Sequence, residues 1–319
     1  MNKYNRDKHL YLNKNIIKYL PIVSEIYNQK KNLPKLVSSR GILHECFIKS
    51  YSPVSSIKKL LDYNLSLLIE NSTIYICTSA INEFIKILPN IKYKFVLVTG
   101  DADEDPNIFD TSFIDNPQII HWFAQNCTKI HPKITIIPIG LDYHTLENCQ
   151  KNHPWGNKIS AIEQEEQLLS IKSNSKPFWE RLKLGYANFQ YSLNGTYCND
   201  RRDAIQNINK DIVYYEQNKL NREESWKKQS EYAFVISPHG NGLDCHRTWE
   251  ALCLGCIPIV KTSGIDRLFD DLPVLIVKDW KDITSELLNS TAEEFKNKEF
   301  KMEKITLEYW INLMNSYKM

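Results

Sequence analysis

One short segment of the chain concentrates the side chains best suited to bind an anion. It covers residues 237–252, follows an apolar run at 232–236, and reads SPHGNGLDCHRTWEAL. Gly240 and Gly242 would let the backbone approach a phosphate closely. A helix that begins in this segment would add unpaired N–H groups and a partial positive charge at its amino end. The segment therefore predicts a phosphate-binding loop.

The first turns of that helix carry a charged pair. Arg247 is a forked donor that suits a diphosphate. Glu250 lies three residues later on the same helix face, where a carboxylate can accept both hydroxyls of a ribose. Alternatively, the glycines form an ordinary turn and the pair makes a surface salt bridge. The pair directly precedes an apolar run at 251–260, and this setting in a largely buried helix favours a functional role. His239 and His246 flank the expected phosphate and can each donate a hydrogen bond to it.

The elements that must position these residues form an alternating pattern. From about residue 60 onward, strand-like runs alternate with helix-like ones, which is typical of an α/β protein with a parallel sheet flanked by helices. The strands expected in the first half are 73–78, 94–99 and 133–139, with 119–125 ambiguous between strand and helix. A charged helical stretch at 159–171 is followed by turn residues, and we place a boundary there between domains 1–175 and 176–319.

The second half repeats the alternation. Its expected strands are 185–193, 212–215, 232–236, 257–260 and 274–277, and its expected helices are 201–209, 222–230, 245–254 and 292–317. The last of these is a single charged amphipathic helix that we expect to pack back onto the first domain. Ligands of open parallel sheets bind at the carboxyl ends of the strands, so the loop after 232–236 is a favourable place for chemistry.

The stretch from His246 to Val260, HRTWEALCLGCIPIV, resembles the C-terminal donor-binding signature of exostosin-like glycosyltransferases. The shared pattern is an Arg three residues before a Glu, an Ala-Leu helix, and then Gly-Cys-Ile-Pro. The likeness is specific over 237–260 and looser over the rest of the second half. There, Asn188 with Arg201 and Arg202 is similar to the first strand of the family domain and the basic residues after it. The first half matches less clearly.

This resemblance implies a GT-B fold, in which two Rossmann-like domains with parallel sheets face each other across a cleft and the C-terminal domain binds a nucleotide-sugar. By resemblance, Arg247 contacts the diphosphate and Glu250 the ribose. The donor-binding residues expected on this basis are Arg201, Arg202, His239, Gly240, Asn241, Gly242, Asp244, His246, Arg247 and Glu250.

The implied reaction moves a sugar from a nucleoside diphosphate-sugar to a hydroxyl of a glycan or glycoconjugate. The resemblance leaves open whether the nucleotide is UDP or GDP. We expect inversion at the anomeric carbon and no obligatory metal or other cofactor.

Asp101 and Asp103 suggest alternatives to a metal-independent GT-B enzyme. They follow the run 94–99 and mimic the Asp-x-Asp pair that holds Mg²⁺ or Mn²⁺ in metal-dependent GT-A glycosyltransferases. A short acidic cluster after a strand is as often a solvated turn. In the two-domain interpretation, either aspartate is a candidate general base for the acceptor hydroxyl. A third alternative is a non-catalytic protein that binds a nucleotide or a glycan.

Some remaining polar residues are weaker candidates, because a lone histidine or tryptophan is more often structural. Those near strand ends are His121, His131, Asp142 and His144, and the tryptophans considered for stacking on sugars are Trp122, Trp155 and Trp179. Cys253 and Cys256 form a Cys-x-x-Cys without a second pair of ligands, which favours packing over zinc binding.

The composition of the chain excludes several classes of protein. A chain of 319 residues predicts two domains, and 42% hydrophobic with 24% charged residues is ordinary for a globular protein. The 40 basic residues are dispersed among 38 acidic ones, so nucleic-acid binding gains no support. The apolar runs are far shorter than the roughly 20 residues of a membrane span. Eight scattered cysteines and the absence of an apolar signal core in residues 1–18 lead us to expect a cytoplasmic protein.

Overall fold

The computed structural model describes residues 33–49, 65–150, 153–190 and 196–318. The chain divides into two units, Met1–Pro34 and Lys35–Met319. All the elements below belong to the second unit. Within the described ranges, no helix is both long enough and apolar enough to cross a membrane.

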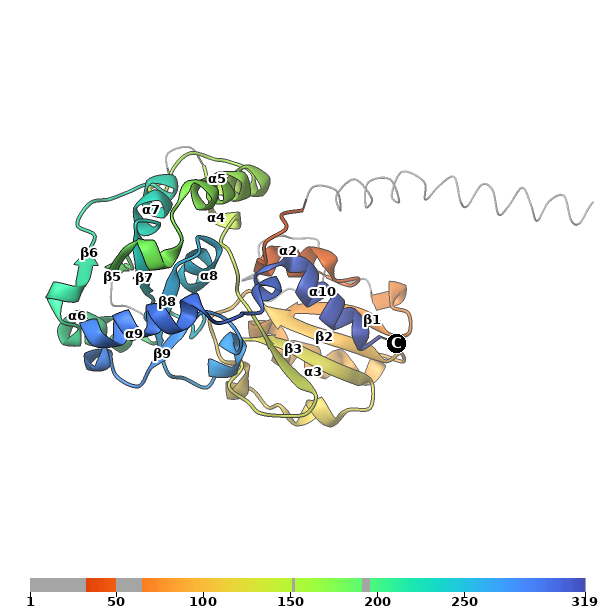
Figure 1. Cartoon of the computed structure of the whole chain (residues 1–319). Helices are drawn as coiled ribbons and strands as arrows, with labels where there is room; N and C mark the ends of the chain where they lie inside the picture. Colours follow the sequence, from red (N-terminus) through yellow and green to blue (C-terminus); the bar gives the residue numbers. More distant parts are fainter. Residues whose placement is uncertain (1–32, 50–64, 151–152, 191–195, 319) are drawn as a thin grey trace, which may run out of the picture. The chain divides into compact units, whose positions relative to one another are not determined.

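The first sheet is wholly parallel. Its strands, in spatial order, are β1 (Ser72–Cys77), β2 (Phe95–Gly100), β3 (Ile119–Gln125) and β4 (Ile134–Ile137). Successive side chains of a strand point to opposite faces, and both faces of this sheet are covered. Phe95 and Leu97 share a core cluster with α3 (Ile81–Ile87), whereas Val96 and Val98 share another with α2 (Ser39–Glu45) and α10 (Leu307–Ser316) (Figure 1).

The second sheet is also wholly parallel, in the order β6-β5-β7-β8-β9. Its strands are β5 (Leu182–Ala187), β6 (Val213–Tyr215), β7 (Tyr232–Ile236), β8 (Ile257–Lys261) and β9 (Leu275–Val277). On one face, Phe234 and Ile236 share a cluster with α6 (Cys198–Asn207) and α9 (Ser285–Lys296). Val235, on the other face, shares a cluster with α5 (Ala161–Asn174), α7 (Arg222–Gln229) and α8 (His246–Cys253).

Two parallel sheets flanked by helices confirm the expected α/β class. The segment 119–125, which the sequence left ambiguous, is a strand because it pairs on both sides, with β2 and with β4. The division of the chain at residue 175 stays a prediction.

The observed strand β5 both begins and ends earlier than the strand expected at 185–193. β5 spans Leu182–Ala187, and residues 191–193 of the prediction lie outside the described part of the chain. The strand ends at Ala187 because its neighbours end there as well: Ala187 pairs with Tyr215, the last residue of β6. Asn188 then turns its side chain to Ser225, to which its Nδ2 donates at 2.6 Å.

The expectation of one C-terminal helix over 292–317 is wrong. α9 ends at Lys296, a 3-10 turn follows at Met302–Ile305, and α10 begins at Leu307. The two helices bury their apolar faces in different clusters, Leu288 of α9 beside the second sheet and Trp310 of α10 beside the first. Thr306 begins the new helix by accepting a hydrogen bond from the Tyr309 N–H.

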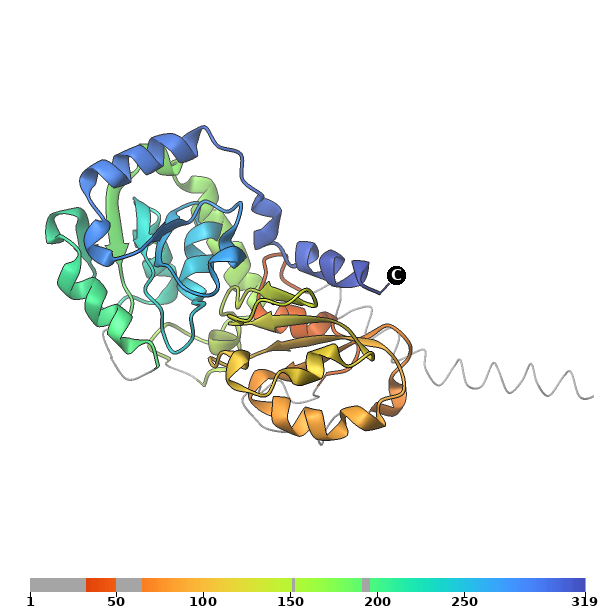
Figure 2. The same ribbon diagram turned by 90° about the horizontal axis from the view of Figure 1, so that it is seen from below.

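α10 packs beside α2 at the beginning of the second unit, and Figure 2 shows the two together from below. The Leu307 N–H donates to the Lys35 carbonyl at 2.8 Å, and Leu36 forms an antiparallel bridge with Thr306. Further along, Tyr317 stacks on His121 with ring centroids 3.9 Å apart. The last described helix therefore contributes to the core of the first sheet.

Candidate functional site

The carboxyl ends of β5 and β7 lie side by side, because the two strands pair in parallel with Gly185 opposite Phe234. Two loops leave the sheet at this edge. The loop after β5 begins with Asn188 and Phe189, and the loop after β7 covers residues 237–245 and leads into α8.

Two arginines from different helices contact these two loops. Arg201 of α6 donates through Nε to the His239 carbonyl at 3.2 Å. Arg247 of α8 donates through Nε to Asn188 Oδ1 at 3.3 Å, and its guanidinium carbon lies 5.6 Å from the centre of the Phe189 ring. Two permanent positive charges are thus held at one edge of the sheet, beside the amino end of α8.

The two glycines of the loop are needed for close packing. A Cβ at Gly240 would lie 2.7 Å from Nη2 of Arg201. A Cβ at Gly242 would lie 2.6 Å from Nδ2 of Asn126 and 2.9 Å from the Asp103 carbonyl oxygen. Neither glycine has a positive φ. The sequence explained these glycines by the approach of a phosphate, and the structure adds that protein groups already approach them.

His239 presents an unused ring nitrogen inside the site. Its Nδ1 lies 2.8 Å from the Leu243 carbonyl, so Nδ1 carries the proton and Nε2 is left as an acceptor in the neutral ring. Nε2 is buried, and no described residue forms a hydrogen bond with it. The side chain can therefore accept a hydrogen bond from a bound group.

Asp244, which the sequence places among the donor-binding residues, is saturated by protein donors. Its Oδ2 accepts from the Ile139 N–H at 2.7 Å, and Trp249 Nε1 donates to both oxygens at 2.9 and 3.0 Å. Burial raises the pKa of this carboxyl to about 6, against the opposing effect of these donors. Asp244 fixes the start of α8 to the loop after β4.

The other expected donor residues lie nearer the surface. Arg202 is exposed and donates to Asn199 Oδ1 at 3.3 Å, and Asn241 is exposed at the tip of the loop. Glu250 is half-buried on α8, one turn beyond Arg247. The structure thus brings Arg201, His239 and Arg247 to one sheet edge and leaves Arg202 and Asn241 toward solvent.

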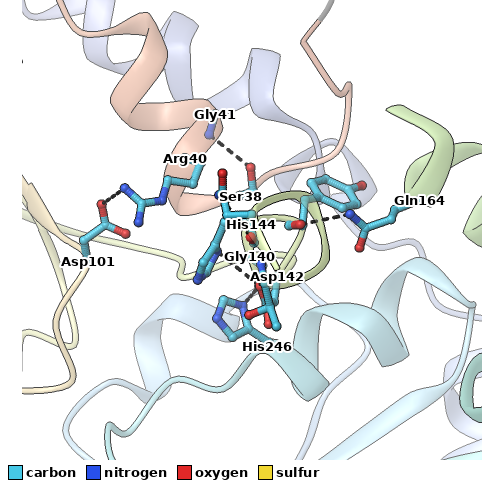
Figure 3. Close-up of polar contacts among 12 residues, drawn as sticks. Ser38, Arg40, Gly41, Asp101, Gly140, Asp142, His144, Gln164 and His246 are labelled. Atoms are coloured by element: carbon cyan, nitrogen blue, oxygen red, sulfur yellow. Dashed lines mark hydrogen bonds and ion pairs between the residues drawn. The ribbon is translucent and has the colours of Figure 1, made fainter. Parts of the chain in front are cut away.

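His246, the first residue of α8, connects the site to the loop after β4. Its Nδ1 lies 2.7 Å from the Gly140 carbonyl, and its ring centroid is 5.9 Å from that of His144 (Figure 3). Gly140 has a φ of +64°, and a Cβ there would meet the Val37 carbonyl oxygen at 2.2 Å. Only glycine fits this turn.

Asp142 is the centre of a buried polar network in the same loop. Its Oδ2 lies 3.1 Å from Nη2 of Arg222 on α7, and its Oδ1 lies 3.2 Å from Nδ1 of His144. Arg222 also donates to the Asp142 carbonyl and, at 2.8 Å, to Gln164 Oε1. Burial alone would raise the pKa of Asp142, but His246, His144 and Arg222 outweigh it and hold the pKa well below its usual range.

The two aspartates after β2 have different surroundings. Asp101, at a φ of +56°, is almost fully buried and pairs with Nη1 of Arg40 at 3.2 Å. Asp103 is exposed, and its backbone carbonyl accepts from Asn126 Nδ2 at 3.3 Å. Among the residues that the structure describes, no three His, Cys, Asp or Glu side chains are grouped to hold a metal ion.

The weaker candidates are mostly accounted for by packing. His121 is buried, bonded to Thr135 Oγ1 at 2.8 Å, and burial lowers its pKa to about 4. His131 lies 3.4 Å from Asp115 on a separate loop. Cys253 and Cys256 are buried, unpaired thiols whose pKa values burial raises. The tryptophans differ, since Trp122 is fully buried, Trp155 stacks against the Arg222 guanidinium at 4.9 Å, and Trp179 is partly exposed.

Sequence reasoning missed Arg40, Asn126 and Arg222. Each acts on a residue far away in the chain, as when Arg222 pairs with Asp142. A lone arginine at the start of a charged helix looks like an ordinary surface residue, so no local signal identified it.

Comparison with known proteins gives only remote likenesses. No protein-family model and no curated protein matches this sequence. A solved structure described as an alpha1,3-fucosyltransferase aligns with a TM-score of 0.38 at 11% identity, covering 78% of this chain and 90% of that one. Another, described as "Trehalose-6-phosphate from E. coli bound with UDP-2-fluoro glucose", aligns with a TM-score of 0.31 at 10% identity, covering 79% and 71%. Likenesses this remote transfer no function.

Proposed function

We propose that this protein is a glycosyltransferase that moves a sugar from a nucleoside diphosphate-sugar to an acceptor hydroxyl. The observation that carries the proposal is the pair of arginines at one sheet edge. Arg201 and Arg247 come from different helices. At the adjoining carboxyl ends of β5 and β7, Arg201 contacts both loops, through the carbonyls of His239 and Gln190, and Arg247 contacts the loop after β5. This edge is where open parallel sheets bind their ligands.

In the proposed donor site, different residues bind different parts of the nucleotide-sugar. Arg247, Arg201 and the amino end of α8 bind the diphosphate, because all three supply positive charge or N–H donors. Nε2 of His239 accepts a hydrogen bond from a hydroxyl of the donor, and Glu250 accepts hydrogen bonds from the hydroxyls of the ribose. As the bond from the sugar to the diphosphate breaks, negative charge grows on the leaving oxygen, and the arginines stabilise it.

We further propose that the reaction needs no metal ion and inverts the anomeric carbon. Two guanidinium groups and a helix amino end can together neutralise a diphosphate without a divalent cation. The acceptor is a hydroxyl of a glycan or glycoconjugate. We place the protein in the cytoplasm, a compartment supported by its eight unpaired cysteines.

The test is a thermal-shift screen of the full chain with UDP, GDP, CMP and their sugars, in EDTA and in Mn²⁺. We expect one nucleoside diphosphate to raise the melting temperature in EDTA. Stabilisation in Mn²⁺ alone would favour the metal-dependent alternative built on Asp101 and Asp103. Tight binding without turnover of any donor would favour the non-catalytic alternative.

Two substitutions then test the residues. Arg247→Ala and Glu250→Ala should each weaken nucleotide affinity by roughly tenfold to a hundredfold, since a charge-assisted hydrogen bond is worth about 1.5 to 3 kcal/mol. Lys227→Ala is the control, because Lys227 is exposed on α7 and, within the described part of the chain, forms its ion pair with Glu223 of its own helix. Unchanged affinity in both site variants, measured by titration calorimetry, would remove the proposed donor site.

A further inference from the structure

We propose that His144 is the general base that takes the proton from the acceptor hydroxyl, and that Asp142 is its positioning residue. The inference rests on the proposed transfer reaction and names a catalytic residue for it. His144 begins the short helix α4 (His144–Asn148), which follows the loop after β4.

A carboxylate that is itself fixed lies beside the His144 ring. Nδ1 of His144 lies 3.2 Å from Asp142 Oδ1, and the Asp142 side chain is 6% exposed. The Thr145 N–H donates to the same oxygen at 3.0 Å, and Arg222 holds the other oxygen at 3.1 Å. Nδ1 is buried and forms no hydrogen bond with a described residue, so Asp142 acts on the ring through its charge. A negative charge beside Nδ1 favours the tautomer with its proton there, which leaves the lone pair on Nε2.

Nε2 is the ring atom available for chemistry. The His144 side chain is 30% exposed. No described residue forms a hydrogen bond with Nε2, and unlike Nδ1 this atom is not enclosed by the protein. The imidazole therefore has one edge buried beside Asp142 and one edge open, an arrangement that suits a general base.

His144 also lies next to the amino end of α8. Its ring centroid is 5.9 Å from that of His246, the first residue of α8, and Arg247 follows directly (Figure 3). The bond between His246 Nδ1 and the Gly140 carbonyl joins the two loops at this point. A hydroxyl bound at Nε2 of His144 would therefore be near the place where the diphosphate is proposed to leave.

The charges around His144 keep it ready to accept a proton. Burial lowers its pKa, Asp142 raises it, His246 and Arg40 lower it, and Asp101 raises it, with a net lowering. The ring is consequently neutral at pH 7. The two aspartates after β2 are less suitable bases. Asp101 is buried against Arg40, and among the described residues none forms a hydrogen bond or ion pair with the exposed side chain of Asp103.

The step conserves atoms and electrons. Nε2 of His144 takes the proton of the acceptor hydroxyl as the acceptor oxygen forms a bond to the anomeric carbon. The bond from that carbon to the diphosphate oxygen breaks, and its electron pair leaves with the nucleoside diphosphate. The proton on His144 then passes to solvent through the exposed edge of the ring.

The test is the release of UDP or GDP from a panel of UDP- and GDP-sugars by the full chain, with a mixture of oligosaccharide acceptors. We expect His144→Gln to lower kcat by about 10²- to 10⁴-fold while nucleotide affinity stays within about threefold. His131→Gln is the matched control, because His131 also lies beside an aspartate, Asp115 at 3.4 Å, but on another loop. This variant should keep wild-type kcat.

The pH profile separates a base from a structural residue. Wild-type kcat should fall in acid as His144 becomes protonated, and His144→Gln should lack this fall. Asp142→Asn removes the charge that raises the pKa of His144, so the acid limb should move to lower pH. Should Asp142→Asn not fold, the profile of His144→Gln decides alone.

Two results would overturn the inference. One is wild-type kcat in His144→Gln, and the other is loss of the acid limb in His246→Gln with the limb kept in His144→Gln. Either would leave the proposed function standing. If the wild-type chain neither binds nor turns over any donor of the panel, the proposed function itself fails and the inference falls with it.

Discussion

Gly240 and Gly242, two residues apart in one loop, face neighbours that differ in how easily they can move. A Cβ at Gly240 meets the end of the flexible Arg201 side chain, whereas a Cβ at Gly242 meets the backbone oxygen of Asp103 as well as Asn126. A guanidinium can swing aside at small cost, but a backbone carbonyl in a packed loop cannot.

Alanine substitutions should therefore separate binding from stability. Gly242→Ala should lower the free energy of unfolding by about 1 to 3 kcal/mol, the usual cost of overpacking. Gly240→Ala should change stability much less but weaken nucleotide binding, because it displaces Arg201. Urea denaturation and nucleotide titration of both variants measure the two effects. Equal stability of the two variants would contradict this account.

Sequence could indicate those candidate residues that are local to one motif. Arg247, Glu250 and the glycines stand within a few positions of each other, and their types and spacing suggested an anion site before any fold was known. Asp244 belonged to the same motif, yet it binds the Ile139 N–H and Trp249 instead. Trp249 belongs to the same motif, but Ile139 is 105 positions away, so the motif alone does not determine whether this carboxylate faces a ligand or the protein.

At the scale of elements, α10 is the part that the sequence placed least well. Strands were predictable because a buried parallel strand is a short continuous apolar run. The break before α10 was not, since residues 297–301 contain no proline or glycine to stop a helix. It depends on Trp310 and Leu307 entering the core of the first sheet.

Trp310 should accordingly carry much of the stability that α10 contributes. It is 2% exposed, and its Nε1 donates to the Lys304 carbonyl at 2.8 Å. Trp310→Ala should lower the free energy of unfolding by about 3 to 5 kcal/mol. Trp179→Ala serves as the comparison, because Trp179 is 37% exposed and its loss should cost about 1 kcal/mol or less. Chemical denaturation measures the free energy of unfolding of both variants. Similar losses of stability in the two would show that Trp310 does not anchor α10.

At the scale of the whole second unit, the pair of Arg222 and Asp142 joins residues 80 positions apart. It connects α7, beside the second sheet, with the loop that follows the first. Both side chains are buried, so removing one leaves a charge that water cannot reach.

Arg222→Ala should therefore destabilise the protein by about 3 to 5 kcal/mol, the usual cost of a buried charge without its partner. Adding Asp142→Asn should recover part of that loss. Lys227→Ala, which breaks only an exposed pair within α7, should cost about 0.5 kcal/mol or less. Thermal unfolding of the three variants provides the comparison. A loss for Arg222→Ala no larger than that for Lys227→Ala would contradict the role given to this pair.

The sequence was sufficient for the α/β class, because periodicity and strand-sized runs are local properties. It was insufficient for the connections between the sheets. Both sheets contribute to one apolar cluster, and single pairs such as Arg222 with Asp142 and His246 with the Gly140 carbonyl join them as well. Such pairs leave no periodic pattern, since each partner alone has the composition of an ordinary loop or helix end.

The packing of α10 beside α2 also has a consequence for folding during synthesis. A ribosome releases the first sheet, residues 72–137, long before it releases residues 307–316. Until then, the face of the sheet that carries Val96 and Val98 lacks Trp310 and Met314, which share its cluster. In the nascent chain α2 can already cover part of this face, and the part that α10 will cover stays exposed as an apolar surface of the kind that chaperones bind. The first sheet is synthesised before the second, yet it is completed only when α10 has been made.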